Sequence, residues 1–411
     1  MEPFAYIQNR LHCEGVPLAR IAEQFGTPAY VYSRAAILEN FSRIQSGLAG
    51  IPSLVCYSVK ANSNLKILRL LAQAGAGFDI VSGGELARVG RAGADPGRMV
   101  FSGVGKTAEE IDAALASGLL MFNVESEGEL EVIEARAAAA GTTAPIAIRV
   151  NPDVEAETHP YISTGRFIHK FGVPKSSALA LYRRAAASKS LRARGIACHI
   201  GSQILKVEPF LKALDEILEV VKRLEQQGIQ WLDLGGGYGI RYGDEEPLDM
   251  DRLIAELKRR VAGTPYRLIL EPGRAIVGNA GILLTRVLYV KATEQKNFVV
   301  VDSGMNDLLR PALYGSEHQV WPVERRAGPS APADVVGPLC ETGDFLARDR
   351  RLAPLQPGDL LAIMTAGAYG FVLSSNYNSR PRPAEVLVSA SETLLIRSRE
   401  RLDDLMSAEH L

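Results

Sequence analysis

Residues 53–83, SLVCYSVKANSNLKILRLLAQAGAGFDIVSG, contain the pattern that decides the fold. An apolar run at 53–60 is followed by a stretch at 64–74 with apolar residues at helical spacing, a glycine stop at Gly75, and a second apolar run at 77–83. Both runs are apolar on both faces, which is typical of strands in a parallel sheet that helices cover. The stretch therefore predicts a strand, a helix and a second strand parallel to the first.

The same alternation continues to about residue 274. Two of the predicted helices, at 107–117 and 126–140, open with Thr or Ser followed three residues later by Glu, which is the capping-box pattern. Eight alternating units favour a closed (β/α)8 barrel of the TIM type over an open doubly wound sheet. The predicted strands are 53–60, 77–83, 98–103, 120–126, 144–151, 193–201, 229–236 and 266–273. The other predicted helices are 34–48, 64–74, 209–227 and 250–261.

After Arg274 the chain changes character. Short apolar runs are separated by Gly, Pro and charged residues, with little helical spacing, which predicts an all-β C-terminal domain of sandwich or barrel type. We expect two domains: a barrel at 26–274, and a β-domain at 275–411 to which residues 1–25 add. The predicted strands of this β-domain are 283–293, 297–304, 333–340, 359–365 and 384–389.

Composition excludes several classes of function. The 411 residues carry 46 Lys and Arg against 47 Asp and Glu, a net charge of −1, so no global field attracts nucleic acid or an anionic membrane. There is no signal-peptide pattern at the N-terminus and no apolar run long enough to span a membrane, so we expect a cytoplasmic protein. The cysteines are far apart and indicate neither a metal site nor a disulfide framework. They are Cys13, Cys56, Cys198 and Cys340.

In a barrel, functional groups lie at the carboxyl ends of the strands. The first predicted strand ends at Lys60, where a buried lysine is costly unless it is paired or modified. A Schiff base to an aldehyde cofactor would meet this cost, and it requires a lysine of lowered pKa. The alternative is a lysine that leaves the sheet into solvent.

The last three strands end in groups that suit a phosphorylated cofactor. Gly235, Gly236 and Gly237 follow the seventh strand, and barrels often bind phosphate after strands seven and eight. Glu271 follows the eighth strand and suits a pyridinium nitrogen, unless it only pairs with Arg274. The sixth strand ends near two further candidates. The histidine could stack on the cofactor ring, or it could be only a hydrogen-bonded residue of the site wall, and the serine could bind the phosphate. These are His199 and Ser202.

The order of these motifs resembles the alanine-racemase-like barrel decarboxylases of pyridoxal-phosphate fold type III. Three C-terminal motifs make the resemblance more specific and are similar to the diaminopimelate decarboxylase family. A departure from the family pattern is RFIHKFG at 166–172. The barrel motifs are YSVKAN, FDIVSGGE, HPYISTG, HIGSQ, GGGYGI and EPGR, and the C-terminal motifs are VDSGMNDLLRPALY (301–314), GPLCETGD (337–344) and GAYG (367–370).

The resemblance implies a role for each candidate residue. Lys60 would carry pyridoxal 5′-phosphate, His199 would stack on its ring, and Glu271 would pair with the ring nitrogen. A second set would hold the far end of the amino-acid substrate, with Glu341 binding its ammonium group and Cys340 donating a proton. The residues implied near the phosphate are Gly237, Gly273, Arg274 and Tyr369, and those implied for the distal carboxylate are Arg274, Arg310 and Tyr314.

The implied activity is decarboxylation of meso-2,6-diaminopimelate to L-lysine, the last step of lysine biosynthesis. A second carboxylate needs a second cation, and arginine offers two parallel hydrogen bonds to it. The resemblance also implies a homodimer in which Cys340 and Glu341 reach the partner's active site. A buried apolar position is the alternative for Cys340, since free cysteines are often small core residues.

Rival functions remain within and outside this enzyme class. A related decarboxylase would act on ornithine, arginine, carboxynorspermidine or a siderophore precursor, but it would not need Arg310 and Glu341 together. A racemase would need a catalytic tyrosine opposite Lys60. A non-catalytic protein that binds pyridoxal phosphate would need only the barrel, without the β-domain that carries Cys340 and Tyr369.

Overall fold

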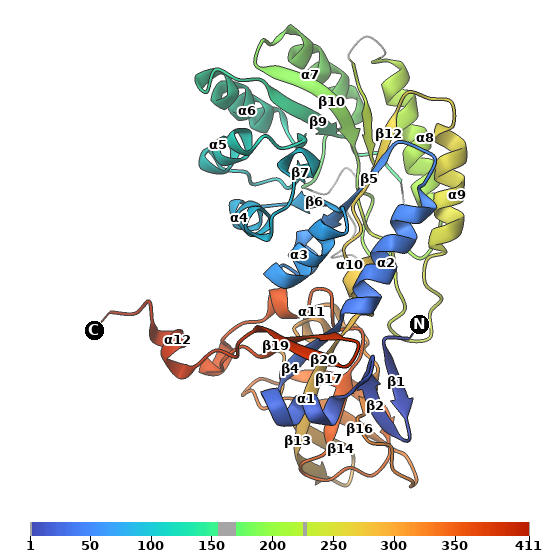
Figure 1. Cartoon of the computed structure of the whole chain (residues 1–411), viewed down its shortest axis with the longest axis vertical. Coiled ribbons are helices and arrows are strands. Elements are labelled where there is room, and N and C mark those ends of the chain that lie inside the picture. Colours follow the sequence, from blue (N-terminus) through green and yellow to red (C-terminus); the bar gives the residue numbers. More distant parts are fainter. Residues whose placement is uncertain (1, 155–169, 225–227, 411) are drawn as a thin grey trace. The chain divides into compact units, whose positions relative to one another are not determined.

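The chain folds into two compact units. The computed structural model describes residues 2–154, 170–224 and 228–410 (Figure 1). Within these ranges, no helix is long and apolar enough to cross a membrane. The barrel unit consists of Phe41–Ile240 and Glu246–Ala275. The sheet unit consists of Met1–Asn40, Arg241–Glu245 and Ile276–Leu411.

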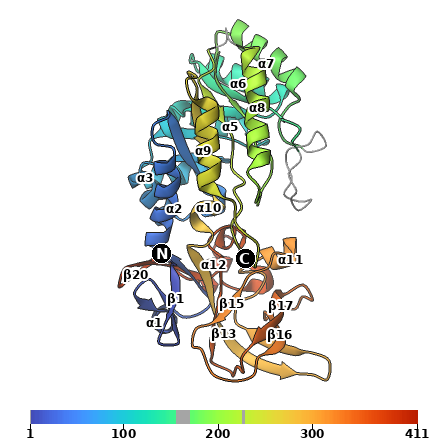
Figure 2. The same ribbon diagram turned by 90° about the vertical axis from the view of Figure 1, so that its right-hand side faces the viewer.

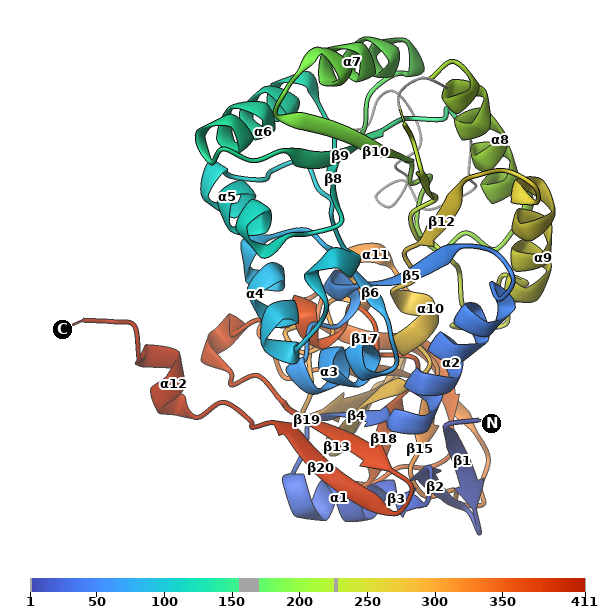
Figure 3. The same cartoon turned by 45° about the horizontal axis from the view of Figure 1, so that its top comes forward.

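Eight parallel strands close into a barrel in the order in which they occur along the chain (Figure 3). Each strand pairs with its sequence neighbours, and β12 pairs with β5 to complete the ring. The strands are β5 (Ser53–Ser58), β6 (Gly77–Ile80), β7 (Met99–Phe101), β8 (Met121–Val124), β9 (Ala144–Arg149), β10 (Leu191–Ala197), β11 (Trp231–Asp233) and β12 (Arg267–Leu270).

Helices surround these strands and bury their outer faces, as Figure 3 shows. Local signals set the helix ends: Thr107 caps α5 in a complete capping box with Glu110, and Gly118 ends that helix in a left-handed conformation. The helices are α2 (Arg34–Gly47), α3 (Leu65–Gln73), α4 (Gly83–Ala92), α5 (Ala108–Ser117), α6 (Glu127–Ala139), α7 (Lys175–Ala187), α8 (Glu208–Lys222), α9 (Met250–Val261) and α10 (Arg274–Val277).

The predicted barrel is confirmed, and all eight predicted strands are present. Several end earlier than predicted: β5 stops at Ser58 rather than at residue 60, and β12 stops at Leu270 rather than at residue 273. The residues after these ends leave the hydrogen-bonded ladder and form the loops that carry the candidate site. The end of the helix predicted at 209–227 lies partly outside the described residues.

The sheet unit is built on a mixed sheet with strand order β17-β16-β14-β13-β4-β19-β20, of which Figure 2 labels β13, β16, β17 and β20. Two further strands join it, since β18 pairs with β13 and β15 pairs with β18. The strands are β4 (Ala29–Ser33), β13 (Gly281–Ala292), β14 (Asn297–Val301), β15 (Val320–Pro322), β16 (Ala331–Val336), β17 (Phe345–Leu352), β18 (Leu360–Ile363), β19 (Ala384–Ser389) and β20 (Glu392–Arg397).

This unit differs from the all-β expectation because it contains short helices. Two of its strand pairs, β4 with β19 and β14 with β16, are parallel. A small antiparallel sheet at the N-terminus packs beside the main one through a shared apolar core. The additional elements are β1 (Phe4–Ile7), β2 (Arg10–Cys13), β3 (Val16–Pro17), α1 (Leu18–Phe25), α11 (Arg310–Tyr314) and α12 (Leu402–Met406).

The structure places residues 26–40 in the sheet unit, whereas the sequence pattern assigned them to the barrel. The reason is β4, which is buried at every position and pairs antiparallel with β13 and parallel with β19. A strand buried on both faces has the same apolar sequence in either setting, so its partners cannot be predicted from its composition.

Candidate active site

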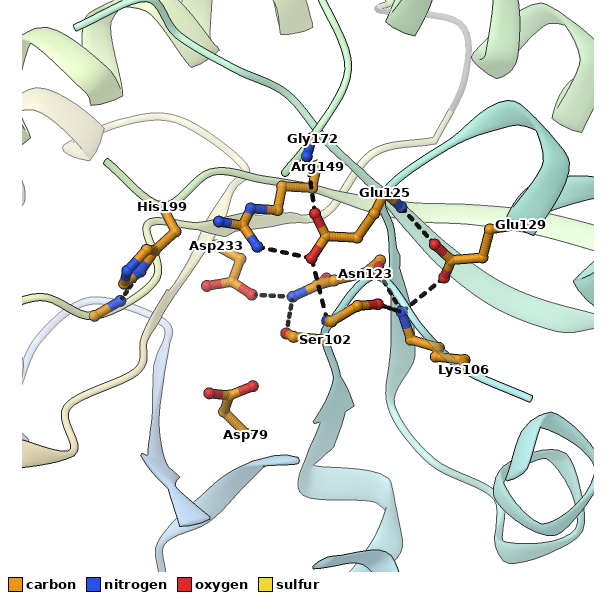
Figure 4. Close-up of polar contacts among 12 residues, drawn as sticks. Asp79, Ser102, Lys106, Asn123, Glu125, Glu129, Arg149, Gly172, His199 and Asp233 are labelled. Atoms are coloured by element: carbon orange, nitrogen blue, oxygen red, sulfur yellow. Dashed lines mark hydrogen bonds and ion pairs between the residues drawn. The ribbon is translucent and has the colours of Figure 1, made fainter. Parts of the chain in front are cut away.

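A cavity of about 370 Å³ lies at the carboxyl ends of the barrel strands. This is the end of a parallel barrel where active sites are found. Figure 4 shows the polar side chains that converge on it from several strands. Its lining residues are Lys60, Val81, Ser102, Gly103, Val104, Asn123, Arg149, Phe171, Ala197, Cys198, His199 and Glu271.

Lys60 lines this cavity and is held by a buried carboxylate. It lies in a single 3-10 turn, Val59–Ala61, directly after β5. Its Nζ is 2.8 Å from Oδ2 of Asp79 on β6, and the Asp79 side chain is fully buried. Ser58 Oγ also donates to Asp79 Oδ2, at 2.9 Å. The lysine therefore does not simply leave the sheet into solvent, because its ammonium group is tied to the barrel mouth.

Glu271 follows β12 and is buried beside a second carboxyl group, Asp233 at the end of β11. Burial, followed by the charges of Asp233 and Asp79, raises the pKa of Glu271 well above its usual range. Oε1 of Glu271 has no hydrogen-bond partner within the described part of the chain. A buried oxygen of this kind suits a donor that arrives with a ligand.

His199 follows β10 and forms part of the cavity wall. The backbone N–H of Gly236 donates to its Nδ1 at 3.1 Å, so Nδ1 is the accepting nitrogen and Nε2 carries the proton. Desolvation, followed by the positive charges of Arg149 and Lys60, lowers the pKa of His199 well below its usual value. The ring is therefore neutral at physiological pH, as a flat stacking surface should be.

The glycine run after β11 is required by crowding. A side chain at Gly236 would collide with the carbonyl oxygen of Glu271. Gly237 has φ +96°, and a side chain there would collide with the carbonyl oxygen of Gly201. The N–H groups of Gly235 and Gly236 donate to Asp233 and to His199, so these two amides orient the site.

Arg274 begins α10 after Gly273, and the residue is buried. Its Nη2 donates to Ser202 Oγ at 3.0 Å, which joins the loop after β12 to the loop after β10. A side chain at Gly273 would lie 2.9 Å from Ala61 Cβ, so the loops after β5 and β12 also approach closely. A cation, a hydroxyl group and compact glycine backbone together suit a phosphate group.

A second group of buried charges supports the part of the cavity wall that Gly103, Asn123 and Arg149 form. Arg149 Nη1 pairs with Glu125 Oε1 at 2.7 Å, and Glu125 Oε2 accepts the N–H of Gly172. The buried Lys106 Nζ contacts Glu129 Oε1 at 2.6 Å and the carbonyl oxygens of Gly103 and Asn123 at 2.8 and 2.9 Å. These pairs fix the loops after β7, β8 and β9 (Figure 4).

In the sheet unit, Arg310 is buried at the start of α11. Its Nη1 lies 3.0 Å from His318 Nε2, and its guanidinium stacks over the ring of Tyr242 at 4.4 Å. His318 Nδ1 lies 2.8 Å from the carbonyl oxygen of Met364 and donates to it, so Nε2 is left to accept from Arg310. The guanidinium is thus held in one orientation by neutral groups. Tyr314, at the end of the same helix, is partly exposed.

Cys340 and Glu341 lie in the loop between β16 and β17, and both are exposed. The alternative considered for Cys340, a buried apolar position, is therefore excluded. Asp344 fixes this loop, since its carboxylate accepts from the N–H of Leu339 at 2.7 Å and from the N–H of Met305 at 2.6 Å. The Cys340 N–H donates to Asn378 Oδ1 at 3.0 Å.

Tyr369 lies beyond β18 and is partly exposed, with a left-handed backbone at φ +55°. Such a conformation is unusual for a bulky side chain and is often found at functional sites. The HPYISTG motif at 159–165 and most of the departure at 166–172 lie outside the described residues.

Sequence reasoning missed the residues that hold the predicted ones. Some of them are polar side chains inside apolar strands, and the rest lie in loops or in a helix next to the strands, so periodicity does not single them out. A signal existed for Asp79, a lone charge in the four-residue run GFDI, and for Asp233, the only charge in WLD. The others are Ser102, Lys106, Asn123, Glu125, Glu129, Arg149, Tyr242 and His318.

The barrel residues fit pyridoxal phosphate. An amine, Lys60, and a carboxyl group, Glu271, line one cavity, and Arg274 with Ser202 offers a phosphate site. These are the groups that an aldehyde, a protonated ring nitrogen and a phosphate require.

Comparison with known proteins agrees with this fit. Residues 34–278 match the family model described as "Pyridoxal-dependent decarboxylase, pyridoxal binding domain". The chain is 54% identical to the diaminopimelate decarboxylase of Pseudomonas aeruginosa, an alignment that covers 100% of this chain and 99% of the relative.

Solved structures give the same result. The chain resembles diaminopimelate decarboxylase from Helicobacter pylori complexed with L-lysine, with a TM-score of 0.93, 42% identity, and coverage of 95% of this chain and 99% of that one. It also resembles the enzyme from M. jannaschii in complex with L-lysine, with a TM-score of 0.94, 37% identity, and coverage of 100% and 98%. The chain therefore belongs to the diaminopimelate decarboxylase family of pyridoxal-dependent decarboxylases.

Proposed function

We propose that this protein decarboxylates meso-2,6-diaminopimelate to L-lysine and carbon dioxide. The observation that carries the proposal is the cavity that Lys60 and Glu271 line together, in a chain that matches its diaminopimelate decarboxylase relatives over its full length. The solved relatives from H. pylori and M. jannaschii hold L-lysine, which is the product of this reaction.

The residues of the barrel bind and orient the cofactor. Pyridoxal phosphate, when bound, supplies an electron-withdrawing ring that accepts the electrons left on the substrate when carbon dioxide departs. Lys60 holds the aldehyde, and Glu271 accepts a hydrogen bond from the ring nitrogen. The neutral His199 forms the stacking face. Gly237, Gly273, Arg274, Ser202 and Tyr369 surround the phosphate in this proposal.

A second set of residues recognises the end of the substrate that does not react. Arg310, pre-oriented by His318 and Tyr242, pairs with the distal carboxylate, and Arg274 and Tyr314 assist. Glu341 pairs with the distal ammonium group. Amino acids that lack this second pair of charges leave Arg310 and Glu341 without their partners, which disfavours them strongly.

We further propose that the working form is a homodimer. Cys340 and Glu341 of one subunit serve the barrel of the other, and the Cys340 thiol delivers a proton to the α-carbon after decarboxylation. The exposure of this loop in the single chain supports the proposal, because a proton donor for a partner's site must be accessible.

A substrate panel tests the function. The purified holoenzyme is given meso-diaminopimelate, lysine, ornithine, arginine or carboxynorspermidine, and carbon dioxide release is measured. We expect kcat/KM for meso-diaminopimelate to exceed every other value by at least about a hundredfold, since missing charged groups are discriminated strongly. A higher value for any substrate with one carboxylate would contradict the proposal, and release from none would support a binding protein.

A further inference from the structure

An arginine and a histidine are in direct contact inside the sheet unit. Arg310 begins α11, and His318 lies just before β15. Arg310 Nη1 is 3.0 Å from His318 Nε2, and His318 Nδ1 is 2.8 Å from the carbonyl oxygen of Met364. Arg310 and His318 are buried, with exposed fractions of 4% and 0%. Solvent and salt therefore screen this contact only weakly.

The strands beside His318 fix the position of its backbone. Val320 in β15 pairs antiparallel with Ile363 in β18. The N–H of Met364 donates to the carbonyl oxygen of Gln319 at 2.8 Å, so the pairing continues beyond the ends of both strands. This continuation brings the backbone of Met364 to the ring of His318. The acceptor for Nδ1 is thus a main-chain group that the sheet holds in place.

Tyr242 packs against both side chains. Its ring meets the ring of His318 edge-on, with centroids 5.2 Å apart, and the guanidinium of Arg310 lies over it at 4.4 Å. The backbone of Tyr242 is itself fixed, because its N–H donates to Glu245 Oε1 at 2.8 Å. The guanidinium is therefore held on its face by Tyr242 and at one N–H edge by His318.

These contacts are compatible with only one protonation state of His318. A carbonyl oxygen cannot donate, so Nδ1 carries the hydrogen in the contact with Met364. A guanidinium cannot accept, so Nε2 has no hydrogen in the contact with Arg310. The ring is therefore the neutral tautomer with its hydrogen on Nδ1. An imidazolium would turn a second N–H group and a second positive charge toward the guanidinium.

We propose that His318 is a positioning residue for Arg310, which fixes the direction of the guanidinium without placing a negative charge beside it. A carboxylate at this position would also orient the guanidinium, but it would compete with the substrate for the positive charge. The neutral imidazole supplies the hydrogen bond alone, so that the charge of Arg310 serves the distal carboxylate. This inference rests on the role of Arg310 in the proposed function.

Two small molecules separate recognition of the distal carboxylate from the rest of binding. L-lysine, the proposed product, retains that carboxylate, and cadaverine is L-lysine without it. Calorimetry on the holoenzyme measures the Kd of each. We expect the wild type to bind L-lysine at least about tenfold more tightly than cadaverine, the effect of hydrogen bonds to a charged group.

A matched pair of substitutions tests what His318 supplies. Glutamine and glutamate have the same shape and both offer an oxygen to Arg310, but only glutamate is ionised beside it. His318→Gln should keep the preference for L-lysine over cadaverine to within about threefold of wild type, whereas His318→Glu should reduce it about tenfold. His318→Phe keeps a ring against Tyr242 but has no acceptor, so it should also lose the preference. The affinity for cadaverine should change by less than about twofold in all three variants.

The outcomes distinguish this inference from the proposed function. Loss of the preference in His318→Gln would show that the acceptor is not what position 318 supplies. Retention of the preference in His318→Glu or His318→Phe would show that a neutral acceptor is not required. Each of these results would overturn the inference and leave the proposed function standing. A wild type that binds both probes equally would instead overturn the role of Arg310 in the proposed function, and this inference with it.

Nuclear magnetic resonance tests the tautomer directly, and it decides if a variant at position 318 does not fold. Isotope-labelled histidine is incorporated into the protein, and the resonances of His318 are assigned as those that a folded variant at this position lacks or that respond to Arg310→Met. Near neutral pH we expect a neutral ring with its hydrogen on Nδ1. Arg310→Met should shift the Nε2 resonance, because it removes the donor. An imidazolium, a hydrogen on Nε2, or an Nε2 resonance that no variant of Arg310 shifts would overturn the proposal.

Discussion

Lys60 Nζ lies 2.8 Å from Oδ2 of Asp79, and the Asp79 side chain is fully buried while 39% of the Lys60 side chain is exposed. The pair is therefore asymmetric, because the buried Asp79 carboxylate has no water to compensate its charge, whereas the Lys60 ammonium group is partly hydrated. Oδ1 of Asp79 has no hydrogen-bond partner within the described ranges, so Lys60 and Ser58 are what compensate this carboxylate.

Removing the lysine should destabilise the barrel, and removing the buried charge as well should restore part of the loss. We expect Lys60→Ala to lower the free energy of unfolding of the cofactor-free protein by about 1–3 kcal/mol, less than for a fully buried pair because Lys60 is partly exposed. Asp79→Asn in the same background should recover about 1 kcal/mol. Urea unfolding of the two single variants and the double variant measures this coupling. Strictly additive effects would show that the two side chains do not depend on one another.

Lys60→Ala should also purify without covalently attached cofactor and without turnover. The reason is that Lys60 is the amine that lines the cavity together with Glu271. Borohydride reduction followed by peptide mass spectrometry locates the attachment in the wild type. A reduced adduct on another lysine of the variant would assign the role elsewhere.

Glu271→Gln should bind the cofactor but lose most of its turnover, by about a hundredfold or more in kcat. A neutral amide does not hold the ring nitrogen in its protonated form, so the ring withdraws electrons less strongly. Steady-state kinetics and cofactor absorbance measure the two effects separately. Near-normal kcat would show that Glu271 serves another purpose, such as the salt bridge with Arg274 considered from the sequence.

Asp307 should make stability depend on pH. Burial raises its pKa to about 7, whereas in the unfolded chain it is near 4. Between these values the folded state binds the proton and the unfolded state does not, so stability falls as pH rises from about 4 to about 7. Asp307→Asn should remove this fall. Between pH 4 and pH 8 the wild type should lose roughly 2–4 kcal/mol more of its free energy of unfolding than the variant does.

Urea unfolding at several pH values measures this difference. The substitution preserves the bond from the Gly304 N–H, which is 2.9 Å from Oδ2, and the unpartnered Oδ1 of Asn306 can turn to face the new amide. If the free energy of unfolding depended on pH in the same way in the variant and the wild type, Asp307 would not be the group responsible.

Subunit mixing tests the proposed dimer. Lys60→Ala and Cys340→Ala are each inactive in this proposal, but random exchange makes about half of the dimers mixed, and each mixed dimer has one site with both residues intact. Activity should recover to about a quarter of wild type. A pull-down with two tags first confirms exchange. No recovery despite exchange would place both residues in one chain and leave the decarboxylase proposal intact.

The sequence predicted the barrel because its strands are buried on both faces and its helices have local caps. Both of these signals are contained in short stretches of sequence. It did not predict the partners of β4, which pairs with residues about 250 and 350 positions later. It also missed β17, whose sequence FLARDRRL is half charged because one edge of this strand is exposed. Local pattern does not contain such long-range pairing.

The residues of the candidate site also divide into those that local sequence predicts and those that depend on long-range pairing. Lys60, His199, Glu271 and the glycine run were found because they stand at strand ends, where polar residues interrupt apolar runs. Asp233 and Asn123 were not, because their importance depends on which strands become neighbours in the closed barrel. A hydrogen bond between side chains 110 positions apart has no signature in either local segment.

The position of β4 has a consequence for how the chain is made. This strand is synthesised before the barrel segment, but it needs β13 and β19, which are synthesised after it. The barrel segment, Phe41–Ala275, is synthesised in between and contains all eight of its strands. During translation one edge of β4 therefore lacks its partner until β13 has emerged, and the other edge lacks its partner until β19 has emerged. A nascent chain of this protein thus carries a strand with unpaired edges throughout the synthesis of the barrel, and this strand is where a holding chaperone would be of most use.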